Sequence, residues 1–237
     1  MNLEILPTRT AGAAENMAID FLLLQRYPRA TVPRFRHYAW RAPAFTFGYA
    51  QKINFVRTQL PPDEHFDLCR RPTGGGIVDH REDWTYSLVI PRGHPLEEQR
   101  AAQSYRVIHE ALAAALVAQG VNAVTKPSEV DPEDAAEATG VCFQRPEVHD
   151  VVHALSGAKI AGAAQKRNKH GLLFQGSIWR PAAGVGIDWE LFRDAFILLL
   201  SKALGNEAQT TPWPDLNEDE VSGLGEQYSS REWIEYR

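Results

Sequence analysis

Three successive glycines at positions 74–76 place the strongest constraint on how this chain folds. They lie in the segment Arg-Arg-Pro-Thr-Gly-Gly-Gly-Ile-Val-Asp-His, residues 70–80. Glycine has no Cβ, so such a loop lets the backbone press against a bound molecule and adopt dihedral angles closed to other residues. Residues 72–76, called the glycine loop below, therefore predict a binding site.

A second segment, Gly-Ala-Lys-Ile-Ala-Gly-Ala-Ala-Gln at 157–165, surrounds Lys159 with small residues. A lysine on an alternating strand usually faces solvent, but these neighbours favour a strand that borders a cavity. An ammonium there is suited to bind a carbonyl oxygen and stabilise an oxyanion. If the two segments are neighbours, Arg70, Arg71 and the basic residues of 166–170 form a basic rim. The alternative for 166–170 is a solvated turn.

Composition excludes several classes of protein. The net charge is −5, which argues against coating nucleic acid. No apolar run has the length of a membrane span, and the amino terminus lacks the pattern of a secretion signal. We expect a cytoplasmic protein whose two cysteines are thiols.

Periodicity indicates alternating helices and strands in one domain. Helical spacing is found over 13–27, 104–119 and 189–203, and strand patterns over 34–47, 65–71, 85–91, 121–126, 148–155, 159–165 and 172–179. We expect a single α+β domain over 1–237, with a mixed or antiparallel sheet and packed helices. The tail 205–237 is expected to be peripheral, with no accessory carboxy-terminal domain.

The long polar loop over 127–146 carries Cys142. A cysteine is often a buried core residue, yet loops of this length are frequently functional, and nearby cations activate a thiol as a nucleophile. Cys69 adjoins two arginines, but its position inside a strand favours packing.

Other site types fit poorly. The glycine loop has neither the Gly-Lys-Ser/Thr of a P-loop nor the spacing of a dinucleotide fingerprint. His149, Asp150 and His153 do not share one strand face, so we assign no metal.

Together these segments resemble the lipoate-protein ligase and octanoyltransferase family. Further blocks in the family's order are Asn-Met-Ala-Ile-Asp at 16–20, 33–40, Phe-Gly-Tyr-Ala-Gln at 47–51, Thr-Tyr-Ser at 85–87 and Gln-Gly-Ser-Ile at 175–178. The resemblance covers residues 16–180. It implies the class II biotin/lipoate ligase-like fold. The basic Gly-Arg-Gly loop expected of biotin ligases is absent from this sequence.

The resemblance also implies an activity. It is closest to the cysteine-dependent octanoyltransferases, in which a Cys-Phe pair precedes the lysine strand as Cys142-Phe143 does here. The implied enzyme transfers an octanoyl or lipoyl group from acyl carrier protein, through a Cys142 thioester, to a lysine of a lipoyl domain or glycine-cleavage H protein. No cofactor is expected. The alternatives are an ATP-dependent lipoate ligase, the only case that needs ATP, and a non-catalytic acyl-binding protein.

The implied site follows the same segments. Cys142 and Lys159 are the expected catalytic residues. The expected substrate-binding residues are Arg71, Thr73, Gly74, Gly75, Gly76, His80, Gly162, Gln165 and Gly176. The neighbours of His80, Asp79 and Arg81, depart from the family pattern.

Overall fold

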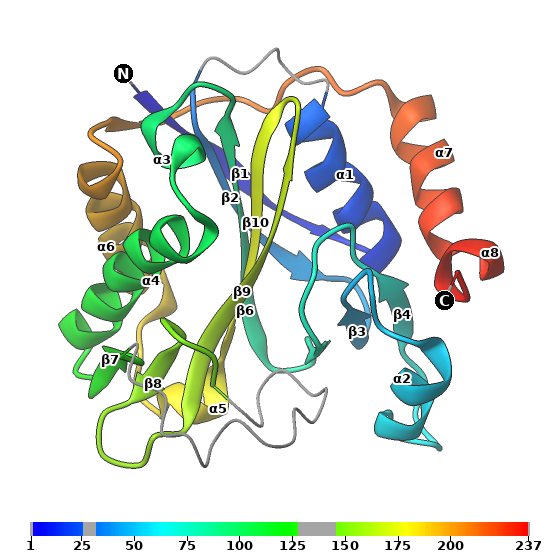
Figure 1. The fold of residues 1–237 in the computed structure, drawn as a ribbon, viewed down its shortest axis with the longest axis horizontal. Coiled ribbons are helices and arrows are strands. Elements are labelled where there is room, and N and C mark those ends of the chain that lie inside the picture. Colours follow the sequence, from blue (N-terminus) through cyan, green and yellow to red (C-terminus); the bar gives the residue numbers. More distant parts are fainter. Residues whose placement is uncertain (1, 26–31, 128–145, 237) are drawn as a thin grey trace.

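The computed structural model describes residues 2–25, 32–127 and 146–236, and within these ranges it is built around one large sheet (Figure 1). The strand order is β11-β1-β2-β6-β10-β9-β8-β7. The first three strands are parallel and the remaining pairs antiparallel. The bounds are β1 (Asn2–Ala11), β2 (Arg34–Trp40), β6 (Asp83–Pro91), β7 (Ala123–Thr125), β8 (Val151–His153), β9 (Lys159–Asn168), β10 (Gly171–Trp179) and β11 (Glu207–Thr210).

A second sheet of three strands, in the order β4-β3-β5, carries the glycine loop between its outer strands. Strand β3 (Ala44–Phe47) runs parallel to β4 (Asp67–Arg70) and antiparallel to β5 (Ile77–Asp79). The strands and turn expected over 34–47 are present. They belong to different sheets, however, because β2 pairs with β1 and β6 while β3 turns away to the small sheet.

Helices cover both faces of the large sheet (Figure 1). On one face α4 (Ala101–Ala118) and α6 (Trp189–Ala203) enclose the largest apolar core, and on the other lie α1 (Ala13–Gln25) and α7 (Glu218–Ser229). Strand β6 contributes side chains to the cores on both faces, because Tyr86 and Leu88 belong to the α4 core while Val89 packs with α1. The short helices are α2 (Ile53–Gln59), α3 (Pro95–Glu98), α5 (Arg180–Ala183) and α8 (Arg231–Ile234).

The segment from residue 205 onward is joined closely to the rest of the domain. Strand β11 pairs with β1, and the side chain of Tyr228 on α7 is buried against α1. These contacts are more extensive than those of the peripheral tail that the sequence led us to expect. The α+β class and the mixed sheet with packed helices are confirmed. None of the helices in the described ranges has the length and apolar character needed to cross a membrane.

Candidate active site

Both segments singled out in the sequence contribute to one narrow pocket between the large and small sheets. We call it the Lys159 pocket. The glycine loop connects β4 to β5, and β9 begins at Lys159, so the two sheets present these segments to each other. The wall of the pocket is formed by Met17, Tyr38, Thr46, Arg71, Val78, His80, Thr85, Lys159, Gly162, Ala163, Ala164, Gln175, Gly176 and Ser177.

Lys159 is buried, in contrast to the usual position of a lysine on a strand. Its Nζ atom lies 2.6 Å from Oδ2 of Asp150, which is itself fully buried. A Cβ atom at Gly162 would stand 2.7 Å from Cε and 2.8 Å from Nζ of Lys159. Gly162 is therefore needed to leave room for the lysine side chain, which places a cation on the pocket wall.

Arg71 shapes the glycine loop from inside the protein. One guanidinium nitrogen donates to the carbonyl oxygens of Gly74 and Gly76, at 2.9 Å each, and the other donates to the Thr46 hydroxyl at 2.8 Å. Gly75 has a φ angle of 88°, a conformation that favours glycine. Gly74 and Gly75 are exposed, and none of the three glycines lines the pocket.

A buried polar chain links the loop to the large sheet and α1. The Thr73 hydroxyl donates to Oε1 of Gln175 at 2.7 Å, and Nε2 of Gln175 donates to Asp20 at 2.8 Å. Asp20 also accepts from Ser87 and pairs with Arg36 at 2.9 Å. Because every member is buried, the chain holds Gln175 in one orientation on the pocket wall.

His80 lies on the same wall with both ring nitrogens engaged. Its Nδ1 is 2.6 Å from Oδ2 of Asp83, and its Nε2 is 2.7 Å from the Thr46 hydroxyl. The ring also stacks on Trp40, with centroids 4.0 Å apart. Asp83 therefore fixes the orientation of the histidine. Sequence reasoning did not single out Asp83, although its spacing three residues after His80 was a usable signal.

Gly176 and Gln165 have different surroundings. Gly176 lines the pocket, and its missing side chain makes room for Tyr86, since a Cβ there would lie 2.2 Å from the tyrosine ring. Gln165 is outside the pocket and donates to the Ala101 carbonyl oxygen of α4 at 3.0 Å. Of the expected substrate-binding residues, the structure thus brings Arg71, His80, Gly162 and Gly176 together with Lys159.

The expected basic rim is wrong for its two arginines. Arg70 is fully buried and donates to the carbonyl oxygens of Tyr49, Gln51, Trp233 and Ile234 at 2.7 to 3.0 Å. Arg71 is buried by the loop contacts already described. The sequence did not reveal that backbone carbonyl oxygens would surround these guanidinium groups.

Of the two cysteines, Cys69 is among the residues that the structure describes. Cys142 lies outside the described residues. Cys69 is buried between α1 and the small sheet, and desolvation by burial raises the pKa of its thiol to about 12. It is therefore a packing residue, as its position in a strand favoured.

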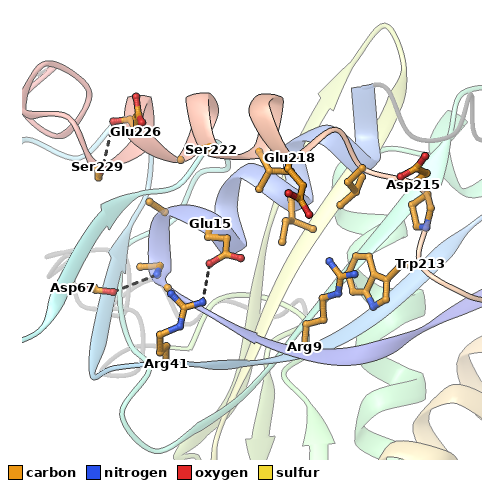
Figure 2. A pocket seen from close by; sticks show the side chains of 18 of the residues that line it. Arg9, Glu15, Arg41, Asp67, Trp213, Asp215, Glu218, Ser222, Glu226 and Ser229 are labelled. Carbon is orange, nitrogen blue, oxygen red and sulfur yellow. Dashed lines mark hydrogen bonds and ion pairs between the residues drawn. The ribbon is translucent and has the colours of Figure 1, made fainter.

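A larger hollow of about 960 Å³ lies away from the Lys159 pocket, between α1 and α7 (Figure 2). Three of its charged side chains are already engaged, since Arg41 pairs with Glu15 at 3.0 Å and Arg9 lies over the ring of Trp213. No residue of strand β9 lines it, whereas Lys159 and Gly162 of that strand line the Lys159 pocket. We therefore take the Lys159 pocket as the candidate active site despite its smaller size.

Comparison with known proteins identifies a family and a similar enzyme. Residues 12–182 match the family described as Lipoyl protein ligase A/B catalytic domain. The octanoyltransferase LipM of Bacillus cereus is 34% identical over 170 residues, which are 70% of this chain and 60% of that protein. The chain thus matches less than two thirds of this relative's length.

Two solved structures share the fold. A protein of T. acidophilum with bound lipoic acid superimposes with a TM-score of 0.72 at 20% identity, over the whole of both chains. A bi-partite lipoate protein ligase of Thermoplasma acidophilum, solved with its E2 lipoyl domain, gives 0.71 at 19% identity over 100% of this chain and 98% of that one. Identities this low establish the fold alone.

Proposed function

We propose that this chain, which belongs to the lipoyl protein ligase A/B catalytic domain family, transfers an octanoyl or lipoyl group to a protein lysine. The observation that carries the proposal is the buried ammonium of Lys159 on the wall of a narrow pocket beside the glycine loop. The name of the Bacillus cereus relative, an octanoyltransferase, supports octanoyl as the group.

The pocket suits an acyl chain. Met17, Val78, Ala163 and Ala164 supply an apolar wall. Burying each methylene contributes about 0.8 kcal/mol, or about 5 kcal/mol for an eight-carbon chain. Chain length therefore governs which acyl groups bind tightly.

The reaction proceeds in two steps. The thiolate of Cys142 attacks the carbonyl carbon of an octanoyl thioester on acyl carrier protein. A new C–S bond forms to Cys142, the C–S bond to the carrier breaks, and the carrier leaves as its thiolate. The amine of a lysine on a lipoyl domain or glycine-cleavage H protein then attacks the acyl-Cys142 thioester. An amide forms, and the Cys142 thiol is released.

Lys159 acts in both steps. Each attack turns the carbonyl oxygen into an oxyanion, and a fixed ammonium donor stabilises that charge more in the transition state than in the substrate. No cofactor enters this scheme. The lipoyl-domain acceptor is supported by the pairing of the Thermoplasma acidophilum ligase with its E2 lipoyl domain in one lipoylation system.

Intact-mass spectrometry tests the proposal directly. The protein is mixed with octanoyl acyl carrier protein without ATP, and a lipoyl domain is then added. We expect one octanoyl group on the protein, mapped to Cys142 by peptide analysis, and its later appearance on the domain. Cys142→Ser should abolish both signals, while the matched variant Cys69→Ser retains them.

Two outcomes would replace the proposal. Modification of the lipoyl domain that needs ATP and free lipoate or octanoate would identify a ligase. Reversible binding of octanoate by calorimetry, with no transfer from either donor, would identify an acyl-binding protein.

A further inference from the structure

Lys159 belongs to a polar cluster whose other members, Asp150 and Tyr105, do not line the pocket. Oδ2 of Asp150 lies 2.6 Å from Nζ of Lys159 and accepts the backbone N–H of Glu147 at 2.7 Å. Oδ1 of Asp150 accepts the hydroxyl of Tyr105, on α4, at 2.5 Å. The Tyr105 oxygen in turn accepts the backbone N–H of Ala163 at 2.8 Å. Both carboxylate oxygens are thus held by groups from separate parts of the chain.

Lys159 and Asp150 differ in their access to the pocket. Lys159 lines the Lys159 pocket, whereas Asp150 and Tyr105 do not. Asp150 has no exposed surface. The carboxylate is therefore placed to act on the ammonium and not on a bound molecule.

The energetics of burial make this pair a strong constraint on geometry. A buried ion pair that loses one partner leaves an uncompensated charge, which is strongly destabilising. The ammonium is accordingly held where Asp150 lies, and the open side of Gly162 provides the space it occupies.

We propose that Asp150, itself oriented by Tyr105, is a positioning residue that fixes the ammonium of Lys159 on the pocket wall for the acyl-transfer steps. The inference rests on the proposed function. A donor that is already in place needs no reorganisation when the oxyanion forms, and this is the condition under which such a group accelerates a reaction most.

A double-mutant cycle tests the inference. Single-turnover transfer from octanoyl acyl carrier protein is measured for the wild type, Asp150→Asn, Lys159→Ala and the double variant. We expect Asp150→Asn to lower the rate constant about 10- to 100-fold, with the KM for the donor within about twofold. In the Lys159→Ala background the same substitution should change the rate less than about twofold, because its effect passes through the lysine.

Tyr105→Phe provides a milder variant that keeps the ion pair. It should lower the rate about 3- to 10-fold in the wild type and leave the Lys159→Ala variant unchanged. Asp194→Asn, which removes an exposed partner of Arg193 on α6, is the matched control and should retain the wild-type rate. Thermal unfolding is recorded for every variant, so that a folding defect is not read as a loss of positioning.

The outcomes separate the two proposals. If the wild type transfers octanoate and the substitutions at Asp150 and Tyr105 lower the rate equally in both backgrounds, the positioning role is overturned while the proposed function stands. If the wild type transfers nothing, the proposed function fails and the positioning role fails with it.

Discussion

Burial of single side chains decides which groups of this protein react and which stay inert. Cys69 illustrates the second case, because desolvation raises the pKa of its thiol to about 12 and the thiolate is the reactive form. We predict that iodoacetamide at neutral pH leaves Cys69 unmodified in the folded protein and modifies it after unfolding. Peptide mass spectrometry of the two samples measures this, and rapid labelling of Cys69 in the folded state would contradict it.

His109 makes stability depend on pH. It is fully buried on α4, and desolvation lowers the pKa of its ring from 6.5 to about 4. His109 therefore binds a proton below about pH 6.5 in the unfolded chain, but only below about pH 4 in the folded chain. This contribution to stability is complete above pH 6.5 and is lost as the pH falls through that window, by about 3 kcal/mol.

His109→Gln tests this dependence, since its amide is able to keep the hydrogen bond to the His149 carbonyl oxygen. We expect the melting temperature of the variant to fall less steeply than that of the wild type between neutral pH and pH 4. His65→Gln, at an exposed position, should follow the wild-type curve. Equal slopes for all three proteins would show that folding does not lower the pKa of His109.

Among the elements, the small sheet depends on a close approach between β3 and the glycine loop. A Cβ atom at Gly48, directly after β3, would lie 2.0 Å from the Gly75 carbonyl oxygen and 2.7 Å from the Gly74 carbonyl carbon. Both are backbone atoms, so the loop itself must shift to accept a side chain. We predict that Gly48→Ala lowers octanoyl transfer more than about tenfold.

Gly223→Ala on α7 is the matched control, because its Cβ would meet open space. This change should leave transfer unaltered and raise stability by about 0.5 to 1 kcal/mol, as expected for glycine replaced inside a helix. Steady-state rates and thermal unfolding of both variants are the measurements. A fully active Gly48→Ala would mean that the loop moves without consequence for the site.

Helices and strands with a clear periodic pattern were predictable from the sequence, but the elements that they pair or pack with were not. The helix over 189–203 was predicted with the bounds that α6 shows, since its apolar spacing is clear and Asp188 caps its first turn. Strand β1 was not anticipated, because its pattern is broken by Pro7 and its burial alternates poorly. Local patterns report a segment's own preference, whereas pairing across the sheet depends on residues far away in the chain.

The same limit applies to the site. Lys159 and the glycine loop were recognisable as unusual combinations of small and charged residues. The partner of Lys159, Asp150, was considered only as a metal ligand, because the side chains that meet in space depend on how β8 and β9 pair. The burial of Arg70 was equally hidden, since its acceptors are backbone carbonyl oxygens that no side-chain pattern reveals.

At the scale of the whole molecule, Arg70 joins the end of the chain to the neighbourhood of the site. It binds carbonyl oxygens of α8 and of the turn after β3, and Gln51 of that turn donates to the Gly75 carbonyl oxygen. Arg70→Lys replaces a five-donor fork with a compact ammonium that is unable to reach all four acceptors. We predict a loss of about 2 kcal/mol in the free energy of unfolding.

Transfer should fall with stability in this variant, because the turn that contacts the glycine loop loses its anchor. Arg57→Lys is the control, since Arg57 pairs with Glu235 on the surface and exposed pairs contribute less than about 1 kcal/mol. Chemical denaturation of the two proteins provides the comparison. A stable Arg70→Lys would indicate that α8 is held by its apolar contacts instead.

The parallel pairing of β1 with β11 has a consequence for how the protein is made. Asn2 pairs with Glu207 and Ile5 with Thr210, so β1 is synthesised long before the strand that covers its outer edge. Until residue 210 has been synthesised, the outer edge of β1 presents unpaired backbone groups, which are a template for pairing with another chain. Nascent chains of this protein therefore carry an exposed strand edge throughout the synthesis of the segment between β1 and β11.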